Sequence, residues 1–136
     1  MTNTQIVDSV IDITLRTLIG WPGAGGDSLR AVGGLIAEMG GDGDHVEIGS
    51  LFGASALVAH STKSKLNFKG SVYCIDPMVF DEHEYCVRVE GNQSKKLLLK
   101  NQHQIFCDNT YHYDRIKLIR KRSYPWPLPK DQRFTT

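Results

Sequence analysis

The segment from residue 45 to residue 76 restricts the fold of this chain more than any other. Residues 45–49 form a short apolar stretch that predicts a strand, and a turn of small residues follows it. Residues 54–66 predict a helix, and residues 72–76 have the β-branched, apolar composition of a fully buried strand. A strand, a helix and a second strand in this order indicate a parallel crossover unit.

Apolar residues at three- and four-residue spacing predict helices on both sides of this unit. We expect helices at residues 4–19, capped by Asn3 or Thr4, and at residues 28–39, capped by Asp27 or Ser28. Residues 94–107 also predict a helix, residues 116–120 a third strand, and residues 78–92 have no clear period. The predicted fold is therefore α/β, with about three parallel strands flanked by helices, whereas sheets average ~5–6 strands.

Composition narrows the functional classes. The 136 residues carry a formal net charge of +1, which gives no basis for binding nucleic acid or an anionic membrane. The chain has neither a signal-peptide pattern nor an apolar stretch long enough to span a bilayer, so we expect a cytoplasmic protein. The three cysteines are widely spaced without a C-x-x-C pair, so we expect reduced thiols and no zinc site.

The chemistry-bearing residues follow the first two predicted strands. Glycines at 49 and 53 let a backbone approach a ligand closely, and the next helix offers free N–H groups and a positive dipole end. Asp76 ends the neighbouring strand, where a carboxylate can accept both hydroxyl protons of a ribose. Together these residues predict a nucleoside-binding crevice at the carboxyl ends of the strands.

Three segments carry a resemblance to a known family. They are VEIGSLFGAS at 46–55, SVYCIDP at 71–77, and FCDN at 106–109 with IKLI at 116–119 and Ser123. The chain resembles class I S-adenosylmethionine-dependent methyltransferases, in the branch of small-molecule and macrocin O-methyltransferase-like proteins. The resemblance covers about residues 29–123 and implies a partial, Rossmann-like methyltransferase fold.

The resemblance also implies roles for individual residues in binding S-adenosylmethionine. Glu47 would lie under the methionine portion or orient the loop, and Asp76 would bind the ribose hydroxyls. The loop after the first strand would contact the cofactor through Gly49, Ser50, Leu51 and Gly53. Pro77 or Met78 would contact the adenine, and Ser123 would lie near the adenine edge. Leu51 stands where many family members have a glycine, and Arg122 stands where an acidic residue is common.

The resemblance assigns a function but leaves part of it outside this chain. We expect O-methyl transfer to a small molecule, and we identify no catalytic residue, because the later strands of the family build the acceptor site. We divide the chain into residues 1–27 (a helix and a glycine-rich loop), 28–123 (the cofactor-binding region) and 124–136 (a proline-rich tail). We expect an incomplete chain, either truncated or dependent on a partner, that is inactive alone.

Two other functions fit the same pattern. A nicotinamide-dependent oxidoreductase shares the layout of strand, glycine turn and acidic strand end, but the turn lacks G-x-G-x-x-G. The second alternative is a non-catalytic module, either a truncated remnant or an interaction subunit. Such a subunit would pair with a second copy of itself or with another protein through the exposed edge of the third strand. His83 with Asp81 and Glu84 matches no standard ligand spacing, and we predict no metal site.

Overall fold

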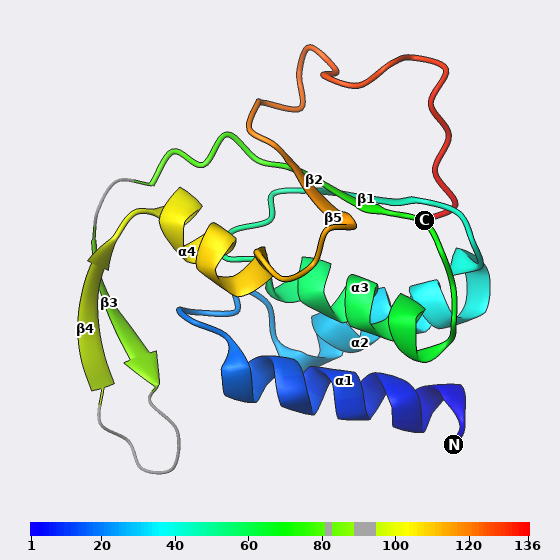
Figure 1. The fold of residues 1–136 in the computed structure, drawn as a ribbon, viewed down its shortest axis with the longest axis horizontal. Helices are drawn as coiled ribbons and strands as arrows, with labels where there is room; N and C mark the ends of the chain where they lie inside the picture. The colour runs from blue at the N-terminus through cyan, green and yellow to red at the C-terminus, as the bar shows by residue number, and fades with distance from the viewer. Residues whose placement is uncertain (81–82, 89–94) are drawn as a thin grey trace.

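A parallel sheet of three short strands lies at the centre of the protein. The computed structural model describes residues 1–80, 83–88 and 95–136. Its main sheet has the order β1 (His45–Ile48), β2 (Val72–Ile75), β5 (Ile116–Ile119), and both pairings are parallel. The register aligns the last residues of the strands, so their carboxyl ends share one edge of the sheet (Figure 1). The predicted α/β class and the three predicted parallel strands are confirmed.

The helices α1 (Asn3–Thr17), α2 (Gly26–Leu35) and α3 (Ala54–Lys65) pack together on one side of this sheet (Figure 1). The inward face of α1 repeats at three- and four-residue steps, and its members are buried: Val7, Val10, Ile11 and Thr14. Gly33 allows α2 to approach α1 closely, because a Cβ there would lie 2.5 Å from the Val7 side chain. Most of α3 is buried, since it lies between the sheet and the other two helices.

The predicted helix caps differ from those observed. Thr2, not Asn3 or Thr4, caps α1, and its side chain forms a capping box with Gln5. Gly25 caps α2, so Asp27 lies in the first turn, where its charge favours the helix N-terminus. A five-residue π-helical segment, η1 (Ile36–Gly40), follows α2 and completes the predicted 28–39 helix.

The prediction of one helix over residues 94–107 is wrong in its first half. Strand β4 (Lys95–Lys100) pairs antiparallel with β3 (His83–Arg88) in a second sheet, and α4 (Gln102–Thr110) begins only afterwards. Asn101 starts α4 with a capping box to Gln104, which fixes the boundary. The run of three leucines in β4 suits a strand as well as a helix, because a short apolar run has no distinguishing period.

The segment after β5 runs without a helix or strand to the end of the sequence, as the prolines at 125, 127 and 129 predict. Its last residues lie along the outer edge of β1. Thr135 N–H donates to the Asp44 carbonyl at 2.9 Å, and Val46 N–H donates to the Thr136 carbonyl at 3.2 Å. β1 and β5 are the outer strands of the main sheet, and residues 135–136 lie along the outer edge of β1.

Within the described part of the chain, every helix is too short or too polar to cross a bilayer.

Candidate functional site

The predicted site residues come together at the carboxyl edge of the main sheet. The turn at residues 49–53 follows β1, the segment at residues 76–78 follows β2, and Ser123 follows β5. Since Ile48, Ile75 and Ile119 are aligned across the three strands, these segments leave the sheet side by side. The structure thus places the candidate residues at one edge, although they are up to 76 positions apart in sequence (123 minus 47).

Asp76 joins two of these segments. Its Oδ2 accepts hydrogen bonds from the N–H groups of Ser50 (2.8 Å) and Leu51 (3.1 Å), and its Oδ1 accepts one from Met78 (2.8 Å). The residue is 7% exposed. A carboxylate has about four acceptor positions, so the protein itself uses most of them. Asp76 therefore holds the turn in place, and it keeps little capacity for ribose hydroxyls.

The turn after β1 has an unusual backbone. Gly49, Leu51 and Gly53 all have positive φ, at 79°, 46° and 96°. No atom lies within 4 Å of the position that a Cβ at Gly49 would occupy, so a ligand can approach the backbone there. A Cβ at Gly53 would lie 3.1 Å from Thr110 and 3.4 Å from Phe106. Gly53 thus allows α4 to pack on the turn, whereas Gly49 leaves open space.

Glu47 and Ser50 form a buried polar group beneath this turn. Ser55 donates a hydrogen bond to Glu47 Oε2 at 2.7 Å, and the Ser50 hydroxyl and the Cys74 thiol lie beside the Glu47 carboxyl, although Glu47 Oε1 and the Ser50 hydroxyl make no well-aligned hydrogen bond among the described residues. Burial raises the pKa of the Glu47 carboxyl, and the Ser55 hydrogen bond opposes part of this rise. Unsatisfied buried oxygens are costly, and they are the groups that a ligand's donors can satisfy.

The other predicted contacts differ in exposure. Met78 is buried with positive φ (54°), and its side chain packs in the core with Cys74 and Phe106. Pro77 and Ser123 are partly buried. The exposed residues near them, Val79 and Phe80, are 60% and 50% accessible. The segment after β2 therefore presents apolar surface to solvent beyond Met78 rather than at Met78 itself.

Two residues that hold the turn were not predicted from sequence. Gln102 is buried at the start of α4, and its Nε2 donates to the Leu51 carbonyl at 3.2 Å. Asn109 Nδ2 donates to the carbonyls of Phe52 and Ile19, both at 2.9 Å, and its Oδ1 accepts from Ile19 N–H at 2.8 Å. The capping pair Asn101 and Gln104 was the sequence signal that could have placed α4 against the turn.

The N–H groups of the turn are already engaged. Those of Ser50 and Leu51 donate to Asp76, and that of Gly53 donates to the Ser50 carbonyl at 2.8 Å. A phosphate-binding turn needs such groups free and directed at the anion. The nearby carboxylate of Asp76 would also repel a phosphate. This turn is consequently poorly suited to a pyrophosphate.

The predicted absence of metal at His83, Asp81 and Glu84 concerns side chains outside the described part of the chain. Where side chains are described, no group of three His, Cys, Asp or Glu residues is arranged to hold a metal ion. Cys74 and Cys107 are free cysteines, and burial raises the pKa of both thiols.

No protein-family model matches the sequence, and no curated protein matches it significantly.

Proposed function

We propose that this chain binds S-adenosylmethionine at the carboxyl edge of its sheet, as the cofactor-binding part of a Rossmann-like methyltransferase that acts on a small molecule. The observation that carries the proposal is the Gly49 turn, open to solvent, above the buried Glu47 carboxyl and Ser50 hydroxyl and beside an acidic strand end. When bound, the cofactor supplies a methyl group activated by its sulfonium.

The residues present fit this group in charge and in the space above Gly49. Glu47 Oε1 and the Ser50 hydroxyl lack partners, and the positively charged methionine portion of the cofactor carries ammonium donors that can satisfy them. Because both atoms are buried, the Ser50–Leu51 segment must shift for this contact to form. Asp76 would meet the ribose through its one remaining acceptor position, which predicts a single strong hydroxyl contact.

The engaged N–H groups of the turn argue against the nicotinamide alternative, because NAD places a pyrophosphate there. One observation favours a non-catalytic role. Asp76 and Gly53 each have a structural function, because Asp76 holds the turn after β1 and Gly53 lets α4 pack on that turn. A binding experiment separates these alternatives directly.

The test is calorimetric titration of the folded chain with S-adenosylhomocysteine, with NAD as the control ligand. Gly49→Ala places a methyl group in the open space, and we expect it to weaken binding at least tenfold. Gly41→Ala is the matched control, since Gly41 also has positive φ and no neighbouring atom within 4 Å, but lies before β1. Binding of NAD alone would favour the oxidoreductase, and a folded chain that binds neither ligand would favour the non-catalytic role.

A further inference from the structure

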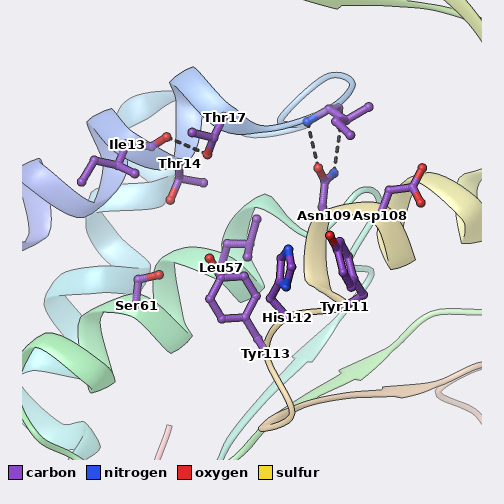
Figure 2. A pocket seen from close by; sticks show the side chains of 11 residues that line it. Ile13, Thr14, Thr17, Leu57, Ser61, Asp108, Asn109, Tyr111, His112 and Tyr113 are labelled. Carbon is purple, nitrogen blue, oxygen red and sulfur yellow. Dashed lines mark hydrogen bonds between the residues drawn. The ribbon is translucent and has the colours of Figure 1, made fainter.

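A second candidate site lies away from the carboxyl edge, between α1, α3 and the segment after α4. A cavity of about 540 Å³ opens there, and Figure 2 shows its lining side chains. This volume lies in the range of small-molecule sites, ~300–1,000 Å³. None of the nine predicted cofactor contacts lines it.

Two hydroxyl groups on one side of the cavity have no hydrogen-bond partner in the described part of the chain. Thr14, on α1, is only 4% exposed, and Ser61 lies on the same side of the cavity, on α3 (Figure 2). The neighbouring Thr17 differs, because its hydroxyl donates to the Ile13 carbonyl at 2.9 Å. The Thr14 and Ser61 hydroxyls can therefore each donate to and accept from a ligand.

Aromatic rings form the other side of the cavity. The rings of Tyr111 and His112 stack with centroids 3.7 Å apart and planes tilted by 37°, and Tyr111 is 71% exposed. Tyr113 is held by an edge contact to His60 at 4.9 Å. Leu57 lies between the rings and the hydroxyl groups (Figure 2). An aromatic ring packed here gains stacking as well as burial.

The side chain of Asn109 holds the two sides of this cavity in place. All of its side-chain donors and its acceptor are engaged with the backbone of Ile19 and Phe52, so it fixes the end of α4 against the segment that follows α1. The two sides of the cavity come from those elements. A ligand would consequently meet an ordered site, which lowers the entropic cost of binding.

We propose that this cavity binds a small aromatic compound that carries a hydroxyl or amide group. The ring packs on Leu57 against the Tyr111 and His112 rings, and the polar group bonds to the Thr14 and Ser61 hydroxyls. The site does not depend on the proposed cofactor site, and a chain that fails to bind S-adenosylhomocysteine can still bind here.

The test uses 2-phenylethanol as the probe and 2-cyclohexylethanol as a control that keeps the hydroxyl but lacks the aromatic ring. Each is titrated into the full chain and followed by amide chemical shifts. For a probe of this size we expect a Kd on the order of millimolar. The aromatic alcohol should bind about five times more tightly, with the largest shifts at residues 13–17, 57–61 and 108–113.

Variants assign the two ends of the ligand. Thr14→Val and Ser61→Ala should each weaken binding of 2-phenylethanol about fivefold, through loss of one hydrogen bond, while Tyr111→Leu should abolish the preference for the aromatic alcohol. Ser9→Ala on α1 is the control and should change nothing, because Ser9 does not line the cavity. Equal affinity for the two alcohols, or shifts outside these residues, would overturn the proposal.

Discussion

The two ends of the parallel sheet bond their buried polar groups differently, although His45 Nε2 at the amino end also lacks a partner among the described residues. At the amino end, the buried Lys63 donates to the carbonyls of Gly41 (3.3 Å), Gly43 (2.6 Å) and Lys69 (3.3 Å). At the carboxyl end, Glu47 Oε1 and the Ser50 hydroxyl have no partner among the described residues.

Non-glycine residues with positive φ occur at both ends of the sheet. Leu51 and Met78 lie at the carboxyl end and Asn67 lies before β2 at the amino end, and this conformation costs leucine and methionine more free energy than asparagine. At the amino end, Asp42 and Asp44 accept hydrogen bonds from Lys69 N–H (2.8 Å) and Ser71 N–H (2.7 Å), which ties the loops before β1 and β2 together. The amino end therefore ties its loops together with Lys63 and two aspartates, while the carboxyl end carries the two bulky residues with positive φ.

The largest expected effect is at Lys63. Lys63→Met leaves three carbonyls without their donor, and we expect it to lower the free energy of unfolding by about 4 kcal/mol. Urea denaturation measures this as a lower midpoint. Lys65→Met, on the exposed side of the same helix, is the control and should change stability by less than about 0.5 kcal/mol. If Lys63→Met and Lys65→Met lowered the free energy of unfolding equally, the hydrogen bonds of Lys63 at the amino end would not stabilise the fold.

The next effect is the pH dependence of His45, also at the amino end. Burial, with the nearby Lys63 charge, lowers the pKa of His45 from 6.5 to about 4. A histidine with a lowered pKa resists protonation when folded, so its stabilisation is complete above pH 6.5 and is lost as the pH falls to 4. The loss approaches about 3 kcal/mol.

Urea denaturation between pH 7 and pH 4 checks this expectation. His45→Gln should flatten the acid side of the stability profile, because glutamine does not titrate. His112→Gln, at an exposed position, should leave the profile of the native chain intact. If His45→Gln lost stability with acid as steeply as the native chain does, the acid sensitivity would belong to other groups.

The smallest effect has the opposite sign and lies at the carboxyl end. Because burial raises the pKa of Glu47, its ionisation removes stability as the pH rises through that pKa. Glu47→Gln should therefore raise the free energy of unfolding at pH 7 and have little effect at pH 4. Glu38→Gln, an exposed control, should do neither. A destabilised Glu47→Gln protein at pH 7 would mean that the two ends of the sheet are alike.

Sequence patterns predicted the central elements of this fold well. The strands at residues 45–49, 72–76 and 116–120 each lie within one residue of those observed, because buried parallel strands are short apolar runs bounded by turn residues. The pattern failed at β4, where three leucines between lysines fit both periods. Pairing with β3 decides that segment, and no local signal reports such a pairing.

At the candidate site, sequence predicted that the residues would lie together at the carboxyl edge of the sheet, but not their hydrogen bonds. Asp76 was expected to face a ligand, yet three N–H groups already bind it, since the turn after β1 folds over the end of β2. Gln102 was not singled out, and Asn109 was noted only within the FCDN segment, because a buried amide in a short helix resembles any surface amide in sequence. Their function depends on backbone carbonyls more than 50 positions away.

The amide of Asn109 also sets an order for folding. It bridges to Ile19 across 90 positions, and to Phe52 across 57. Contacts of such high sequence separation form late, because the chain must first lose the entropy of closing a long loop. During synthesis, α1 and the turn after β1 emerge well before α4 does. Until residue 109 has been synthesised, the carbonyls of Ile19 and Phe52 bond to water instead. A newly made chain would therefore form its binding surfaces last.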